Sequence, residues 1–127
     1  MRLLIDTHVL LWWDAQNPVL NESVKDLLAD PENAVFVSAA SVWEIATKAR
    51  SGKLIFKGSV LKTISQNGFE TLPISAADAE VAGSLDWEHR DPFDRMLVAQ
   101  ARNHRLTLIS ADAALRGRIE IAQIWAR

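Results

Sequence analysis

Arg2-Leu3-Leu4-Ile5-Asp6 is the stretch of this sequence that decides the fold, because three consecutive apolar residues end directly in an aspartate. A short, continuous apolar run is typical of a β-strand that is buried on both faces, as the strands of a parallel sheet are. A carboxylate at the end of such a strand is poorly solvated and needs a cation or several hydrogen-bond donors. We therefore expect a strand at residues 2–5 and a functional role for Asp6.

The rest of the chain continues this alternation of apolar runs and helical patterns. Further strands are expected at residues 34–37, 69–72 and 106–109, with an edge strand at 121–125. Helices are expected at residues 8–14, 20–28, 42–49, 58–68, 75–85, 91–104 and 111–115. In the helix at 58–68, Leu61 and Ile64 are expected to face inward. Repeated strand–helix units predict an α/β protein with a central parallel sheet of four or five strands.

Length and composition indicate one globular domain over residues 1–127. Hydrophobic residues make up 49% and charged residues 24%, which is usual for a globular protein. The sequence has no run of about 18 apolar residues, so we expect no membrane span. Asp6 comes too early for a secretion signal. The absence of cysteine excludes disulfides and thiolate metal sites, so a cytoplasmic location is expected.

The formal net charge of −2 argues against a protein that coats nucleic acid through a general basic surface. It does not exclude a nuclease, because carboxylates that bind metal lower the total charge. Local contacts with phosphate groups remain open to Lys48, Arg50, Lys53, Lys57, Arg90, Arg95 and Arg102. Each of these bases can equally be a solvated surface charge.

Three further acids, Glu44, Asp94 and Asp112, are expected at the same edge of the sheet as Asp6. The carboxyl ends of parallel strands meet at one edge, where ligands bind. Asp112 follows the strand at 106–109, and Glu44 and Asp94 lie near the starts of helices, which begin at that edge too. Four converging carboxylates suit Mg²⁺ or Mn²⁺, which prefer oxygen ligands. Water activated by such a cation can attack a phosphodiester bond.

Each of these acids also has a purely structural explanation. The pairs Ser41/Glu44 and Asp91/Asp94 both have the spacing of a helix capping box. If Ser38 rather than Ser41 is the cap, Glu44 lies beyond capping reach. Asp112 in turn can simply start the helix expected after it. Capping does not explain why the first and fourth strands are also followed by acids.

Histidine and tryptophan carry less information than the acids. Their spacing forms no ligand motif, so we expect surface or cap roles for His8, His89 and His104. Core and interface packing is expected for the tryptophans, namely Trp12, Trp13, Trp43, Trp87 and Trp125. The adjacent pair Trp12 and Trp13 places at least one ring on an exposed face, which we expect to belong to an interface with another protein.

Four segments that together span the chain carry a family resemblance: residues 4–12 (LIDTHVLLW), 37–46 (VSAASVWEIA), 89–101 (HRDPFDRMLVAQA) and 108–112 (LISAD). They resemble the PIN-domain family, in particular the VapC-type ribonuclease toxins of toxin–antitoxin pairs. The resemblance implies a three-layer α/β/α sandwich, an endoribonuclease dependent on Mg²⁺ or Mn²⁺, a homodimer, and inhibition by a small VapB-type antitoxin.

The resemblance also assigns residues to the site. It places Asp6, Glu44, Asp94 and Asp112 at the metal-binding acidic positions. Ser110 matches a hydroxyl position beside the last acid, and Asp91 is an auxiliary acid for which a helix cap fits equally well. For contacts with RNA phosphates we single out Lys48, Arg90 and Arg95.

Three functions remain open on the sequence. The first is a metal-dependent ribonuclease toxin. The second is a phosphohydrolase that uses Asp6 as a covalent nucleophile, although the usual D-x-D pair is interrupted by His8. The third is a binding module without catalytic activity, in which the acids only cap helices.

Overall fold

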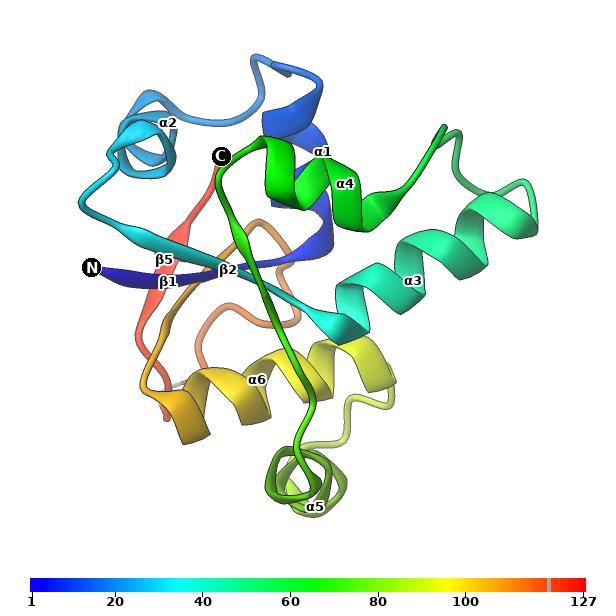
Figure 1. Ribbon diagram of the computed structural model, residues 1–127. Coiled ribbons are helices and arrows are strands. Elements are labelled where there is room, and N and C mark those ends of the chain that lie inside the picture. Colours follow the sequence, from blue (N-terminus) through cyan, green and yellow to red (C-terminus); the bar gives the residue numbers. More distant parts are fainter. Residues whose placement is uncertain (119) are drawn as a thin grey trace.

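The computed structural model describes residues 1–118 and 120–127, and over these residues a parallel sheet is covered by helices on both faces (Figure 1). Its strands are β1 (Arg2–Ile5), β2 (Ala34–Ser38), β3 (Glu70–Leu72), β4 (Thr107–Ser110) and β5 (Gln123–Trp125). The helices are α1 (Thr7–Asp14), α2 (Glu22–Ala29), α3 (Ala39–Arg50), α4 (Val60–Gln66), α5 (Ala76–Ser84) and α6 (Pro92–His104). Within the same residues, none of the helices is both long and apolar enough to cross a bilayer.

The strands lie in the order β3-β2-β1-β4-β5, and all neighbouring pairs are parallel. β1 is the central strand, and Leu3, Leu4 and Ile5 are fully buried. The predicted parallel sheet with a buried first strand is therefore confirmed. Ile5 lies beside Val37 of β2 and Ile109 of β4, so the carboxyl ends of these three strands are level with one another. Residues that follow them start from the same edge of the sheet.

Successive side chains of β1 point into two separate hydrophobic layers. Leu3 and Ile5 pack in a layer that contains buried residues of α1 to α4, among them Val9, Val24, Ile45 and Ile64. Leu4 packs on the opposite face with residues of α6, among them Leu97, Val98 and Ala101. Burying each large aliphatic side chain stabilises the fold by roughly 1.5 to 3 kcal/mol. The expected three-layer sandwich is confirmed.

Polar caps fix where the helices begin, as several sequence patterns predict. Ser75 and Asp78 form the expected capping box of α5. Asp91 caps α6, and Pro92 takes the first helical turn, where its missing N–H is not needed. Ser38, and not Ser41, caps α3. Glu44 therefore lies in the second turn of α3, where it is not needed as a cap.

Two details of the expected elements are wrong. The helix expected at 111–115 is replaced by turns over residues 113–117. There the N–H groups of Leu115 and Arg118 bond to the carbonyls of Asp112 and Leu115, three residues back, which is the pattern of turns and not of an α-helix. Leu61 is 56% exposed instead of facing inward. α4 spans Val60–Gln66 and buries Val60 and Ile64, so the inward position predicted for Ile64 is confirmed.

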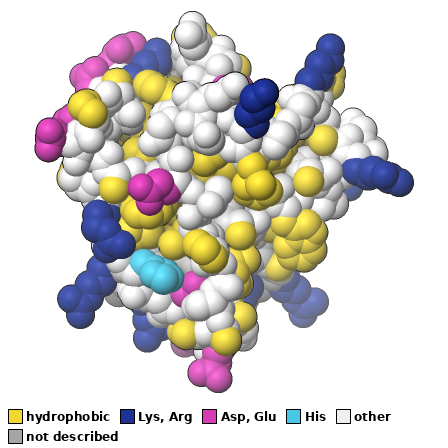
Figure 2. Space-filling view, in the orientation of Figure 1, with side chains coloured by type: hydrophobic (Ala, Val, Ile, Leu, Met, Phe, Trp, Pro, Cys, Tyr) yellow, Lys and Arg dark blue, Asp and Glu magenta, His cyan; other side chains and the backbone are white. Residues whose placement is uncertain are grey.

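Large hydrophobic side chains are exposed around α3 and α4. Figure 2, in the orientation of Figure 1, shows hydrophobic side chains at the surface where these helices lie. The exposed fraction is 61% for Trp43, 90% for Ile55 and 56% for Leu61. Packing was expected for Trp43, and its ring contacts that of Phe93, with 5.2 Å between the ring centroids. Much of the residue stays exposed, because the buried side of α3 runs through Ser41, Glu44 and Ile45.

Candidate metal centre

All four predicted acids line one cleft of about 100 Å³ at the carboxyl ends of the strands. Asp6 follows β1, Glu44 lies on α3 after β2, and Asp94 lies in the first turn of α6. Asp112 comes from the segment after β4. α6 runs antiparallel to the strand that follows it, so its first turn reaches the same edge. The structure thus brings together carboxylates that are far apart in the sequence.

Asp6 is 5% exposed and has a structural role that was not expected from the sequence. Its Oδ1 accepts the Val9 N–H at 2.9 Å and so caps α1. Its Oδ2 accepts the Ser110 hydroxyl at 2.6 Å. Burial raises the pKa of Asp6 despite these two hydrogen bonds and the nearby His8, and the charge of Asp112 raises it further. The ionised form of Asp6 is therefore disfavoured, mainly by burial, even though each oxygen has a donor.

Ser110 links the two acids that follow β1 and β4. Its hydroxyl donates to Asp6 and accepts the Asp112 N–H at 3.0 Å. Asp112 Oδ1 accepts the Ala114 N–H at 2.9 Å and holds the next turn. The auxiliary position predicted for Ser110 is therefore inside the acidic cluster, where it fixes the spacing between the two strand ends.

Glu44 is 9% exposed, and both of its oxygens contact protein groups. Oε1 accepts the Thr7 hydroxyl at 2.6 Å, and Oε2 accepts from Lys48 Nζ at 2.8 Å. The hydrogen bond to Glu44 raises the pKa of Lys48, and the charges of Glu44, Asp91 and Asp94 raise it further against partial burial. Lys48 thus lies in the cleft as a cation among carboxylates.

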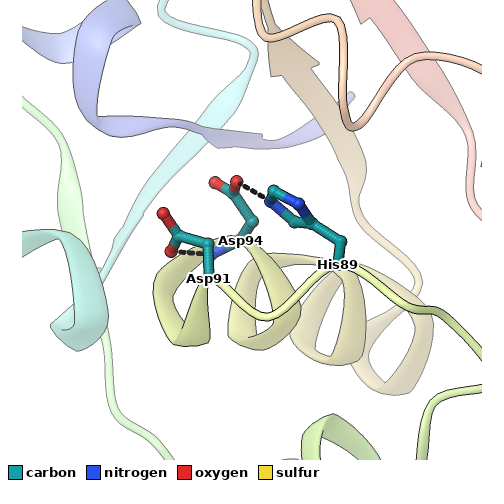
Figure 3. Close-up of side chains that lie close together, drawn as sticks. All are labelled: His89, Asp91 and Asp94. Atoms are coloured by element: carbon teal, nitrogen blue, oxygen red, sulfur yellow. Dashed lines mark hydrogen bonds and ion pairs between the residues drawn. The ribbon is translucent and has the colours of Figure 1, made fainter.

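Asp91 and Asp94 form the α6 side of the cleft (Figure 3). Asp91 Oδ1 accepts the N–H groups of Phe93 and Asp94, at 2.9 and 3.2 Å. Asp94 Oδ2 lies 2.7 Å from His89 Nε2, so the carboxylate turns toward the imidazole and not toward the backbone of its own helix. Ligand atoms of His89, Asp91 and Asp94 all lie within 4.8 Å of one another.

The pKa of Asp94 is raised to about 6. Burial is the largest cause, and the charges of Asp91 and Asp112 add to it, while the contact with His89 lowers it. A raised pKa means that the surroundings of Asp94 disfavour its ionised form. Asp94 is thus explained better by a cation than by a simple cap.

Sequence reasoning missed Thr7 and His8, which line the cleft, and His89, which contacts Asp94 beside it. Thr7 directly follows Asp6, but nothing in the sequence indicates that its hydroxyl reaches Glu44. His89 was expected at the surface, and the structure instead places it against Asp94, five residues away through a loop for which no spacing rule exists. The pair Glu44 and Lys48 was readable, because an i, i+4 spacing brings opposite charges together on a helix.

The three bases expected at RNA phosphates lie in different surroundings. Lys48 lines the cleft, and Arg90 is exposed beside it. The Arg95 guanidinium is instead hydrogen-bonded to backbone carbonyl groups, those of Ala82, Gly83, Leu85, Trp87 and His89. Its N–H donors all bind protein carbonyl groups, so Arg95 holds the loop between α5 and α6 instead of facing the cleft as a phosphate contact.

The residues present fit a hard divalent cation. The cleft is lined by carboxylate oxygens, which Mg²⁺ and Mn²⁺ prefer. The pKa values of Asp6 and Asp94 are raised mainly by burial and further by the charges of neighbouring acids. A bound cation relieves repulsion of this kind.

Comparison with known proteins identifies the class to which this fold and site belong. The family model described as PIN domain matches residues 3–118. The chain belongs to the PIN domain family.

Particular relatives are also similar over nearly the whole chain. The sequence is 28% identical over 117 residues to Ribonuclease VapC22 of Mycobacterium tuberculosis (strain ATCC 25618 / H37Rv), which covers 90% of this chain and 89% of that protein. The fold is similar to a chain of VapBC2 from Rickettsia felis bound to a promoter DNA fragment, with a TM-score of 0.71, 14% identity and full coverage of both chains. DNA-bound VapBC from Salmonella typhimurium gives a TM-score of 0.69 at 13% identity, covering 98% of each chain.

Proposed function

We propose that this protein is a metal-dependent endoribonuclease and the toxin of a toxin–antitoxin pair. The observation that carries the proposal is the convergence of Asp6, Glu44, Asp94 and Asp112 on one cleft at the carboxyl edge of the sheet. Membership of the PIN domain family supports it. The M. tuberculosis relative is named a ribonuclease, and the similar solved folds come from toxin–antitoxin complexes.

In the proposed site, Asp6, Glu44, Asp94 and Asp112 hold Mg²⁺ or Mn²⁺. When bound, such a cation supplies an activated water and stabilises the charge that develops at phosphorus. The chain's own groups orient these acids: Ser110 holds Asp6 and the backbone of Asp112, and Thr7 holds Glu44.

Two bases and one further acid complete the proposed site. Lys48 and Arg90 contact RNA phosphates on either side of the bond that is cleaved. Lys48 is suited to this because its ammonium group already lies at 2.8 Å from Glu44 inside the cleft. Asp91 is an auxiliary acid, since its ligand atom lies within 4.8 Å of those of Asp94 and His89 while it also caps α6.

The proposed partners are an RNA substrate, a VapB-type antitoxin and a second copy of this chain. The exposed hydrophobic side chains Trp43, Ile55 and Leu61 supply apolar surface that protein partners can bury. A single domain and a cytoplasmic location stay predictions from the length and the absence of cysteine.

The phosphohydrolase alternative is less well supported. The second aspartate of the usual D-x-D pair is replaced by His8, and the chain belongs instead to the PIN domain family. Trapping a phosphorylated Asp6 with a phosphoester substrate would favour this alternative over the nuclease.

The proposal is tested with purified protein and a structured RNA, first stripped of metal with EDTA and then supplied with Mg²⁺ or Mn²⁺. We expect cleavage to require the added cation. Asp6→Asn and Asp94→Asn each remove a ligand charge but little volume, so each should lower the cleavage rate about a thousand-fold, or roughly 4 kcal/mol of transition-state stabilisation. Asp26→Asn, an exposed acid on α2, is the matched control. Full cleavage by both site variants would contradict the proposal.

A further inference from the structure

The loop between α5 and α6 is gathered around one side chain, that of Arg95. Its Nε donates to the Ala82 carbonyl at 2.8 Å. Nη1 donates to Trp87 and His89 at 2.7 and 3.0 Å, and Nη2 donates to Leu85 and Gly83 at 3.0 and 3.4 Å. The hydrogen bonds thus connect the last turn of α5, the whole loop and the first turn of α6 through a single guanidinium group.

This arrangement uses a property that arginine alone has among the side chains. A guanidinium is planar and carries five N–H donors in a fixed geometry, whereas a lysine ammonium has three donors around one point. Two of the acceptors, Ala82 and Gly83, are in the last turn of α5, where carbonyl groups lack partners within the helix. Arg95 therefore satisfies backbone groups that would otherwise need water, and it fixes their positions relative to α6.

The loop held by Arg95 ends at the acidic cleft. Along the loop, His89 is the residue nearest α6 whose backbone carbonyl accepts from the guanidinium. The imidazole of the same residue lies against Asp94, with Nε2 at 2.7 Å from Oδ2. Since an ionised carboxylate can only accept, the ring nitrogen is the donor in this pair. Figure 3 shows the second Asp94 oxygen pointing away from His89.

The ring of His89 is also held from one side by an aromatic neighbour. The centroid of the Trp87 ring lies 4.7 Å from that of His89, at an interplanar angle of 35°. The Trp87 ring is itself packed by Arg118, whose guanidinium carbon lies 4.6 Å from the ring centroid. Arg95 binds the backbone carbonyls of both Trp87 and His89, so it sets the position of the whole aromatic pair.

We propose that Arg95 is a positioning residue of the metal centre: it holds the loop so that His89 fixes one oxygen of Asp94 and leaves the other oxygen for the cation. The inference rests on the proposed function for its metal and on the hydrogen bonds of Arg95 for its geometry. Partners that orient a ligating carboxylate are typically worth about 10-fold to 100-fold in metal affinity.

A purely structural role for Arg95 makes a different prediction. If Arg95 only joins α5 to α6, its loss lowers stability but leaves the His89–Asp94 contact and the metal affinity of the folded protein unchanged. The two roles are therefore separated by measurements on folded protein, made below the melting temperature of each variant.

The first measurement tests the positioning without metal. Protein labelled with ¹⁵N-histidine is prepared as wild type, Arg95→Lys and His89→Ala, and the His89 ring signals are assigned by their loss in His89→Ala. We expect Arg95→Lys to shift the His89 Nε2 signal away from its wild-type position and toward that of histidine in an unstructured peptide. Arg102→Lys, at the other end of α6, is the matched control and should leave it unchanged. An unshifted signal in folded Arg95→Lys would overturn the proposal.

The second measurement tests the consequence for the metal by a double-mutant cycle on Mn²⁺ affinity, followed by calorimetry or electron paramagnetic resonance. Arg95→Lys and His89→Ala should each weaken binding about 10-fold or more. The double variant should lose no more than His89→Ala alone, because Arg95 acts through His89. Independent losses that multiply would overturn the proposal, as would wild-type affinity in either single variant.

Failure of the proposed function gives a different pattern. A wild-type protein that binds no Mn²⁺, in either method, removes the metal centre and with it the second half of this inference, while the histidine signals still report the geometry. Should Arg95→Lys not fold, His89→Ala decides the question. This substitution removes the imidazole but keeps the backbone carbonyl that Arg95 binds. Undiminished Mn²⁺ affinity in that variant overturns the role given to His89 and hence to Arg95.

Discussion

Two carboxylates in this molecule, the buried Asp78 and the partly buried Asp94, have opposite electrostatic surroundings. Asp78 of α5 is fully buried, and it accepts hydrogen bonds from Asn103 at 3.0 Å, from the Ser75 N–H at 3.1 Å and from His104 at 3.1 Å. Burial alone would raise its pKa, but these hydrogen bonds outweigh burial and lower it to about 2. The charge of Asp78 is thus satisfied by the protein.

In the cleft, Asp94 has one side-chain partner, His89, and two acids, Asp91 and Asp112, lie near enough to raise its pKa. Burial and the charges of Asp91 and Asp112 raise the pKa of Asp94 to about 6, although His89 lies close by. Burial of an acid is therefore a poor guide to function by itself. The informative observation is whether the surrounding groups are donors, as around Asp78, or further acceptors, as around Asp94.

Saturating the protein with metal should give the largest difference in unfolding free energy between variants of the two sites. A cation that binds only the folded state should raise the unfolding free energy by about 2.7 kcal/mol at a free concentration 100 times its dissociation constant. We expect a saturable increase of the urea midpoint with Mn²⁺ or Mg²⁺, reversed by EDTA. The Asp94→Asn variant should lose most of it, whereas Asp78→Asn should keep it.

This titration also decides between a metal enzyme and a binding module whose acids only cap helices. The binding module predicts the same urea midpoint with and without the cation. KCl at equal ionic strength controls for a general salt effect, because exposed charges respond to any salt.

Asp78→Asn tests the other half of the comparison. The substitution keeps the shape of the side chain but removes the charge that Asn103, Ser75 and His104 stabilise. From the lowered pKa we expect a loss of about 2 kcal/mol in unfolding free energy near pH 7. Urea denaturation measures the loss, and cleavage of RNA at low temperature should stay near the wild-type rate.

Asp86→Asn, an exposed acid in the loop after α5, is the control for this change and should leave stability within about 0.5 kcal/mol. If Asp78→Asn proved as stable as wild type, the hydrogen bonds around Asp78 would not distinguish it from the acids of the cleft.

The sheet and the identity of the four acids could be predicted because they follow from local patterns. The apolar run at residues 2–5, the caps at Ser75 and Asp91, and the acids directly after strands all act over a few neighbouring residues. Parallel strands then bring Asp6 and Asp112 to one edge without any further information. The position of Glu44 needed only the right choice of cap, Ser38 over Ser41.

The remaining parts of the site could not be predicted because they depend on contacts across the fold. His89 contacts Asp94 from a loop whose backbone carbonyl groups bind Arg95, and such side-chain-to-carbonyl hydrogen bonds have no sequence signal. The exposure of Trp43 could not be predicted, because it depends on which face of α3 meets the sheet. Likewise, nothing in the local pattern of residues 111–115 indicates that the segment forms turns instead of a helix.

The pH dependence of stability should have opposite slopes for the two groups, each limited to about 1.4 kcal/mol per pH unit per carboxylate. The pKa of Asp94 is raised from 3.8 to about 6, so the folded state keeps a proton that the unfolded state has released. Its contribution to the unfolding free energy therefore falls as pH rises from about 4 to about 6. The pKa of Asp78 is lowered to about 2, so its contribution falls as pH drops from about 4 to about 2.

Urea denaturation of metal-free protein between pH 2 and 7 measures both slopes in one series. Asp94→Asn should flatten the profile above pH 4 and leave the acid limb as in wild type, while Asp78→Asn should flatten the acid limb alone. Adding Mn²⁺ should abolish the upper slope, because cation binding favours the ionised form that the unbound cleft disfavours. If Asp94→Asn kept the wild-type slope above pH 4, the repulsion would have to be assigned to Asp6, whose pKa is raised in the same direction.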